Sequence, residues 1–148
     1  MRRRLLITIL ALLAVGGGST ALAEVVQIAA VRNGGPGNDR LIGTTGSDRM
    51  NGRGGNDRMD GRGGPDRMNG GSGHDVMFGG AGRDVMAGGR GNDQILGGAG
   101  SDRISGGAGN DQINVRDGQR DRVSCGPGSD RITARDSFDT ISGDCERQ

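Results

Sequence analysis

A nine-residue period runs through the middle of this chain of 148 residues, and no insertion interrupts it. Nine consecutive units cover residues 34–114, from the first unit, GGPGNDRLI, to the last, GGAGNDQIN. Every unit has Gly at position 1, Gly at position 4 and Asp at position 6. A fixed short period means that one structural unit is stacked many times, so it constrains the fold more strongly than local propensity does.

Position 8 of the unit is apolar in all nine copies. Positions 7 to 9 leave room only for a brief strand, in which side chains alternate between the two faces. Position 8 is therefore expected to point inward and position 7 outward. Because Met is pliable and fills irregular space, the pattern predicts a thin, adaptable core. The inward residues are Leu41, Met50, Met59, Met68, Met77, Met86, Ile95, Ile104 and Ile113.

The unit resembles the RTX nonapeptide, the haemolysin-type calcium-binding repeat G-G-x-G-x-D-x-U-x, in which U is a large apolar residue. Position 2 departs from glycine at Thr44, Arg53 and Arg62, and degenerate copies continue through residues 122–123, 126–132 and 139–141. The resemblance implies an all-β fold, a parallel β-roll. This is a right-handed solenoid in which two nonapeptides make one 18-residue turn and Ca²⁺ lies between turns on both sides.

The loop residues suit that ion. A Gly-x-x-Gly stretch enters positive φ at low cost, so its carbonyl groups can be aimed at one point. Ca²⁺ takes about 6–8 oxygen ligands, which one loop cannot supply but two stacked loops can. Pairing each of the nine loops with the loop two units on allows seven sites, and the cap could add more. The expected ligands, besides glycine carbonyls, are Asp39, Asp48, Asp57, Asp66, Asp75, Asp84, Asp93, Asp102 and Asp111, with Asp130 and Asp139 ranked second because their copies are degenerate.

Folding is expected to depend on the ion. The chain has 33 Gly, two Phe and neither Trp nor Tyr, a composition that is otherwise typical of disorder. A core with one apolar residue per unit cannot easily offset the conformational entropy of so many glycines. Binding of several Ca²⁺ ions to the folded state would supply the difference.

The first 23 residues resemble a secretory signal peptide. Arg2–Arg4 form a charged region, Leu5–Val15 an apolar region, and Ala21-Leu22-Ala23 a small-residue cleavage site that leaves Glu24 at the mature terminus. A transmembrane anchor is the alternative. It is disfavoured because the apolar stretch has 11 residues whereas a span needs about 20, so no transmembrane segment is expected after cleavage. A secreted, extracellular protein is therefore predicted.

Solenoid ends need caps, because the last turns otherwise expose their core. Residues 24–33 are expected to form an N-terminal capping strand, and residues 115–148 a C-terminal cap. Cys125 and Cys145 are separated by 20 residues, close to one turn, and an oxidising compartment favours a disulfide between them. Two unpaired thiols or an intermolecular bridge remain alternatives. A zinc site is disfavoured because it usually needs four ligands.

All 19 basic residues are Arg, and the net charge is +1, or −2 without Arg2–Arg4. Stacking would place Arg40 over Arg58 and Arg49 over Arg67 as short ladders. Such ladders could contact an anionic polymer. The preferred interpretation is solubility combined with local pairing to Asp. Sequence-specific nucleic-acid binding is not expected, because aromatic side chains that stack on bases are scarce. Arginine recurs at outward position 7, namely at Arg40, Arg49, Arg58, Arg67, Arg103 and Arg131.

No catalytic motif stands out. The single histidine, His74, lies at variable position 5 of a loop, and the chain contains no G-x-S-x-G, no H-E-x-x-H and no Lys for a P-loop. We therefore expect a non-enzymatic, exported calcium-binding repeat protein that serves as an extracellular structural or binding module. Two alternatives are a cell-surface or matrix adhesion protein that uses the Arg ladders, and an accessory remnant of a secreted RTX-type enzyme or toxin.

Overall fold

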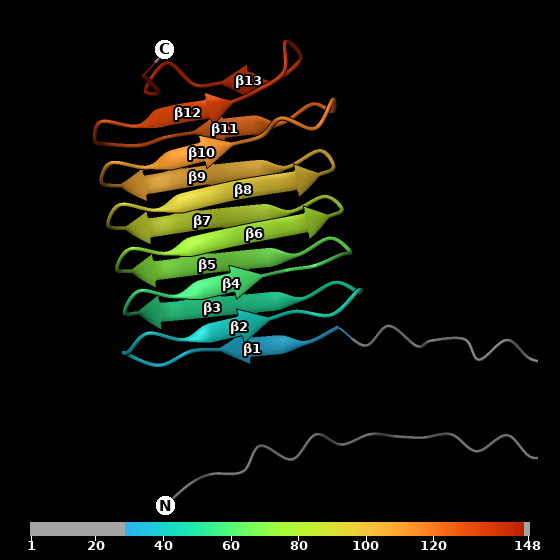
Figure 1. Ribbon diagram of the computed structural model, residues 1–148, viewed down its shortest axis with the longest axis vertical. Helices are drawn as coiled ribbons and strands as arrows, with labels where there is room; N and C mark the ends of the chain where they lie inside the picture. Colours follow the sequence, from blue (N-terminus) through green and yellow to red (C-terminus); the bar gives the residue numbers. More distant parts are fainter. Residues whose placement is uncertain (1–28, 147–148) are drawn as a thin grey trace, which may run out of the picture.

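The computed structural model describes residues 29–146, which form two parallel sheets wound into one solenoid (Figure 1). One sheet contains seven strands: β1 (Val31–Asn33), β3 (Arg49–Gly54), β5 (Arg67–Ser72), β7 (Val85–Arg90), β9 (Arg103–Ala108), β11 (Arg122–Ser124) and β13 (Thr140–Ile141). The other contains six: β2 (Arg40–Ile42), β4 (Arg58–Asp60), β6 (Val76–Ala81), β8 (Gln94–Ala99), β10 (Gln112–Asn114) and β12 (Arg131–Ala134). The chain alternates between the sheets, one strand at a time.

The strand register confirms the predicted β-roll. Every pairing is parallel, and within the regular repeats each residue pairs with the one 18 positions later, as in Arg40 with Arg58 and Met50 with Met68. The offset becomes 19 where β9 meets β11 and where β10 meets β12. This happens because the unit at residues 115–124 has ten residues. Both sheets continue across the extra residue.

Several strands are longer than the sequence indicates. The pattern predicts strands at positions 7 to 9 only, yet β3 and β5 through β9 each have six residues. Pairing continues into positions 1 to 3 of the next unit, as in Gly71 with Gly89. The backbone at position 2 has positive φ, 110° at Gly71, so the chain bends while its pairing with the neighbouring turn is retained.

The core is a single apolar column between the sheets. All nine position-8 residues are buried, and the position-7 residues of the six-residue strands lie outside, as expected. Because the register is uniform, Met59 packs over its equivalents Leu41 and Met77 in the adjacent turns. Val123 continues the buried column, and Ile132 and Ile141 pack against it. Only about one apolar side chain per unit is buried in this way.

The N-terminal end begins at β1, whose Val31 is 64% exposed. Of the expected capping segment 24–33, residues 31–33 form this strand. Residues 24–28 and the expected signal peptide at 1–23 lie outside the described residues. Within residues 29–146 the structure has no apolar helix of the length that a membrane crossing requires.

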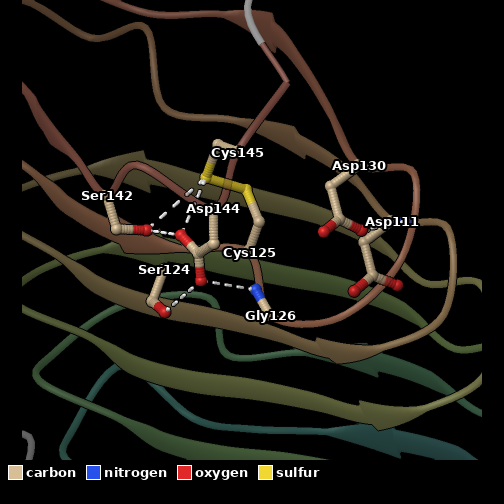
Figure 2. Close-up of a disulfide and its surroundings, with 8 residues drawn as sticks. All are labelled: Asp111, Ser124, Cys125, Gly126, Asp130, Ser142, Asp144 and Cys145. Carbon is tan, nitrogen blue, oxygen red and sulfur yellow. Dashed lines mark hydrogen bonds between the residues drawn. A yellow bond between two sulfur atoms is a disulfide. The ribbon is translucent and has the colours of Figure 1, made fainter.

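A disulfide joins Cys125 to Cys145, as predicted, with a Cα–Cα distance of 5.1 Å (Figure 2). It connects the loop after β11 to the chain after β13, and both cysteines are buried. Asp144 accepts a hydrogen bond from the backbone N–H of Gly126 at 2.9 Å and one from the Ser124 hydroxyl at 3.2 Å. The last turn is therefore held by a covalent bond and by polar contacts, although few apolar residues remain there.

Replacing both cysteines with serine should reduce the free energy of unfolding by about 3 kcal/mol, because the loop is no longer closed in the unfolded state. Urea denaturation with Ca²⁺ present measures this change. Hydrogen exchange should accelerate in β11–β13 and stay unchanged in β5–β7, because the turns of a solenoid contact only their neighbours. Chemical reduction of the native chain should reproduce the effect; unchanged stability in both experiments would contradict it.

Candidate metal centre

Two columns of aspartate run along opposite edges of the roll, where the chain passes from one sheet to the other. The first column consists of Asp39, Asp57, Asp75, Asp93, Asp111 and Asp130, and the second of Asp48, Asp66, Asp84, Asp102, Asp121 and Asp139. The terminal residues Asp39 and Asp139 are half-buried, and the other ten are buried. The structure thus places the eleven expected ligand residues, together with Asp121, in two rows at one-turn spacing.

Each carboxylate connects two turns of the roll. Oδ1 of Asp57 accepts the backbone N–H of Asp39 at 2.8 Å, and Oδ1 of Asp66 accepts that of Asp48 at 2.7 Å. The same contact repeats to the end of both columns. In the first turn, the backbone N–H of Ala30 takes the place of an aspartate and donates to Asp48 at 2.6 Å. One oxygen of every column carboxylate except that of Asp39 is therefore committed to the neighbouring turn.

The second carboxylate oxygen, Oδ2, is the unusual one. In the first turn it has donors, since the backbone N–H of Gly35 reaches Asp39 at 2.7 Å and that of Thr44 reaches Asp48 at 2.5 Å. Further along, nine Oδ2 atoms are buried without any hydrogen-bond partner: those of Asp57, Asp66, Asp75, Asp84, Asp93, Asp102, Asp111, Asp121 and Asp130. Leaving such groups unpaired is costly, so a repeated row of them indicates a cation.

Glycine at position 1 opens a space beside these oxygens. A Cβ atom at Gly106 would lie 2.5 Å from Oδ2 of Asp111 and 2.7 Å from the carbonyl oxygen of Cys125, one turn later. The other column repeats this at Gly79, which lies beside the Gly97 carbonyl oxygen and has Asp84 Oδ2 at 2.6 Å from its would-be Cβ. A carboxylate and a carbonyl therefore converge where a side chain is missing, and both are oxygen ligands that Ca²⁺ prefers.

Backbone carbonyls would have to supply much of the coordination. Within residues 29–146, no three His, Cys, Asp or Glu side chains gather around a point that could hold a metal ion. Each loop contributes one position-6 carboxylate, and the next one in its column belongs to the adjacent turn. The donor set is therefore rich in oxygen, poor in charge and free of nitrogen and sulfur, which fits Ca²⁺ better than zinc or copper.

The carboxylates are destabilised in their ionised form. Burial, opposed in part by the backbone hydrogen bond from Asp48, raises the pKa of Asp66 to about 7. Repulsion from Asp84 and Asp48 adds to this increase. Burial also raises the pKa of Asp102 to about 7 and the pKa values of Asp93 and Asp121 to about 6. A bound divalent ion instead lowers the pKa of these carboxyl groups, because it favours their charged form.

The ion-free and ion-bound roll should therefore respond to pH in opposite directions. A carboxyl whose pKa is raised in the folded state binds more protons there than in the unfolded chain, so ion-free stability should fall as the pH rises from about 4 to about 7. With saturating Ca²⁺, stability should rise over the same interval, because the ion displaces those protons. Thermal denaturation in Ca²⁺-depleted and Ca²⁺-containing buffers measures both trends. Parallel pH profiles in the two buffers would contradict this account.

Filling the space at position 1 should remove one site. In Gly106→Ala, the new Cβ occupies the gap between the Asp111 carboxylate and the Cys125 carbonyl, so we expect one Ca²⁺ fewer by isothermal titration calorimetry. Gly37→Ala is the matched control, because a Cβ at Gly37 meets nothing within 4 Å. Equal stoichiometry in the two variants would exclude a site at this position.

Arginine replaces glycine at position 2 without changing the loop. Arg53 has φ 76° and Arg62 has φ 71°, so both take the left-handed conformation that glycine normally supplies. For a non-glycine residue this costs of order 1–3 kcal/mol. Thr44, the third departure, instead donates its hydroxyl to the Asp48 carboxylate at 3.1 Å. Arg53 and Arg62 therefore keep the positive φ of position 2, whereas Thr44 does not and instead bonds the carboxylate of its own loop.

His74 belongs to a second ladder, on the edge that holds the first aspartate column. At position 5, the side-chain oxygen of Asn38 accepts the backbone N–H of Asn56 at 2.7 Å, and Asn56 accepts that of His74 at 2.8 Å. His74 continues the series, because its Nδ1 accepts the backbone N–H of Asn92 at 2.8 Å. The imidazole is exposed and takes the structural place of an asparagine.

Asp121 is the site residue that the sequence reasoning missed. Its unit has ten residues, so a strict nine-residue count passes over it. The available signal was local: Asp-Arg-Val at 121–123 repeats the Asp-Arg-Met pattern at 57–59. In the structure Asp121 is fully buried, and its Oδ1 accepts the backbone N–H of Asp102 at 2.8 Å.

Comparison with known families agrees with this geometry. The model of the RTX calcium-binding nonapeptide repeat matches the chain in four copies, at residues 33–68, 60–95, 88–119 and 126–144. These matches cover more than half of the sequence and include every column aspartate except Asp121. No curated protein and no solved structure matches the chain.

Proposed function

This chain belongs to the family of RTX calcium-binding nonapeptide-repeat proteins, and we propose that it is an exported module that Ca²⁺ folds or makes rigid. The observation that carries the proposal is the row of nine buried, unpartnered Oδ2 atoms. Bound Ca²⁺ supplies positive charge and an acceptor of oxygen lone pairs between adjacent turns. The twelve column aspartates and nearby glycine carbonyls are the proposed ligands. Two columns of six loops have five gaps each, which allows ten ions.

The protein's own residues explain why ion binding and folding would be coupled. Each turn buries two apolar side chains but also two carboxylates, whose mutual repulsion and burial oppose folding. In the folded roll the backbone N–H of Asp57 holds Oδ1 of Asp75, and that of Asp66 holds Oδ1 of Asp84, so the stacking of two turns and the binding of an ion between them position the same carboxylates. The bound Ca²⁺ ion is then a shared partner of Oδ2 and of the backbone carbonyl oxygen at position 1. Ordering of the glycine-rich chain is offset by binding energy rather than by a large core.

Export is supported by two separate observations. Residues 1–23 have the composition of a secretory signal peptide, and the Cys125–Cys145 disulfide is typical of an oxidising compartment. Outside the cell Ca²⁺ is abundant enough for sites of modest affinity. We propose a binding or structural module rather than an enzyme, because the carboxylates bridge turns and the sole imidazole accepts a backbone hydrogen bond.

Far-UV circular dichroism of residues 24–148, titrated with Ca²⁺ and with excess Mg²⁺ as a control, tests the proposal. We expect a cooperative transition from coil to β-structure that only Ca²⁺ produces. In Asp75→Asn the midpoint should move to about tenfold higher Ca²⁺, because a central ligand loses its charge. Asp60→Asn is the matched control, since Asp60 lies outside the columns and its Oδ1 accepts the Arg62 N–H. A β-rich spectrum in chelator that Ca²⁺ leaves unchanged would refute the coupling.

A further inference from the structure

The strands of the seven-stranded sheet contribute arginine but no acidic residue to its outer face, and Asp144, which follows β13, reaches the C-terminal end of that face at Ser124. Position 7 contributes Arg49 and Arg67 as one paired set and Arg103 and Arg122 as another, with Val85 on the strand between them. Position 9 presents small side chains on the same face: Asn51, Asn69, Ala87, Ser105 and Ser124. No Asp or Glu occurs in any of the seven strands. The six-stranded sheet differs, because β4 contains Asp60.

Hollows lie along this face and at the edge that holds the second aspartate column. Arg83, Arg103, Arg120 and Arg122 line a pocket of about 450 Å³, which we call the arginine pocket. A second hollow of about 410 Å³ shares Arg103 and Arg122 and extends past Ser105 and Ser124. A third, of about 150 Å³, lies between the Arg49–Asn51 and Arg67–Asn69 segments. The face is therefore grooved and basic at both ends.

The guanidinium groups of the arginines on this face form no ion pair with a carboxylate within residues 29–146. The expectation that outward arginines pair with nearby aspartates is therefore not met on this sheet. The physical reason is that the column carboxylates are buried at the edges of the roll and are bonded to other turns. Asp102 lines the arginine pocket, but its Oδ1 accepts the backbone N–H of Asp84 at 2.8 Å. The arginines remain available for an external anion.

Calcium would change the net charge that such an anion meets. Residues 29–146 contain fifteen Arg against seventeen Asp or Glu, a net charge of −2. Each bound Ca²⁺ adds +2, so a second ion already makes the folded part positive. The added charge lies at the two edges that flank the arginine-bearing face, and it neutralises the acids rather than the arginines. Ion binding therefore strengthens the positive potential at the sheet.

We propose that the outer face of the seven-stranded sheet binds an anionic polysaccharide when Ca²⁺ is bound. Guanidinium groups form paired hydrogen bonds with carboxylate or sulfate oxygens. The side chains of Asn51, Asn69 and Ser105 can bond sugar hydroxyls. Arg49 and Arg122 are four strand spacings apart, about 19 Å, which suits an extended chain with several charges. This proposal depends on the proposed Ca²⁺ binding in one respect, which is that the bound ions make the net charge of the folded part positive.

Other polyanions fit the face less well. The seven strands contain no aromatic side chain on which nucleic-acid bases could stack. Val31 and Val85 are the exposed large apolar residues that these strands contribute, so little apolar surface is available for insertion into a lipid surface. Binding to a polysaccharide needs neither feature, because charge pairing and hydroxyl contacts suffice.

Fluorescence anisotropy of the full chain in Ca²⁺, with labelled heparin and labelled polygalacturonate as probes, tests the proposal. Heparin presents sulfate groups and polygalacturonate only carboxylates, so the two probes separate the anion chemistries. We expect binding to at least one, and a loss of affinity of tenfold or more in Arg103→Gln/Arg122→Gln. The matched control is Arg40→Gln/Arg131→Gln, which removes the same charge from the six-stranded sheet. It should bind within about twofold of the native chain.

Circular dichroism of the same samples separates this proposal from the one on folding. If the chain is already β-rich in chelator, Ca²⁺-coupled folding fails, but the arginine variants still test the face. Three results would overturn the polysaccharide proposal: no binding of either probe by the folded protein, equal loss of affinity in the two double variants, or tighter binding of double-stranded DNA than of both polysaccharides.

Discussion

A hydrogen bond between the backbone of one turn and the aspartate of the next underlies this fold. Oδ1 of Asp75 receives the N–H of Asp57, and Oδ1 of Asp93 receives that of Asp75. The bond fixes the 18-residue turn, holds the carboxylate inside the edge and leaves Oδ2 facing the space at the position-1 glycine. Register, burial and the proposed ion site thus depend on one contact. A roll with so thin an apolar core has few other means of holding its turns together.

Charge is segregated as a consequence. Acidic side chains are concentrated at the two edges, where burial favours either protons or a cation, whereas the arginines at position 7 occupy the outer faces of the sheets. One cation–π contact, Arg58 over the Phe78 ring at 4.7 Å, involves an arginine of the six-stranded sheet. The two sheets therefore offer different surfaces, although one repeat generates both. Successive repeats lie alternately in the two sheets, so the residues at the variable positions of odd and even repeats form two different surfaces.

Much of this architecture could be predicted from the repeat, and the exceptions have physical causes. The invariant Gly and Asp positions predict the turn, and the apolar position 8 predicts the inward column that includes Met59. Strand length was underestimated, because pairing continues through positions where glycine adopts positive φ. Asp121 was missed because one extra residue shifts its unit. The ladder through His74 and the unpaired arginines depend on which side chains meet across a turn, and this was not deduced from single units.

Because the strands alternate between the two sheets, odd-numbered and even-numbered repeats place their loops on opposite edges of the roll. Position 5 on the first edge carries Asn38, Asn56, His74, Asn92 and Asn110, whereas on the second it carries Ser47, Pro65, Arg83, Ser101 and Arg120. Removing a single nonapeptide would exchange edges and sheets for everything that follows it. Asparagines would then be stacked on Pro65 or Arg83, and the arginine-bearing face would be broken in the middle. Removing two units preserves every ladder. The indivisible building block of this molecule is therefore the pair of repeats, even though the sequence is written in single ones.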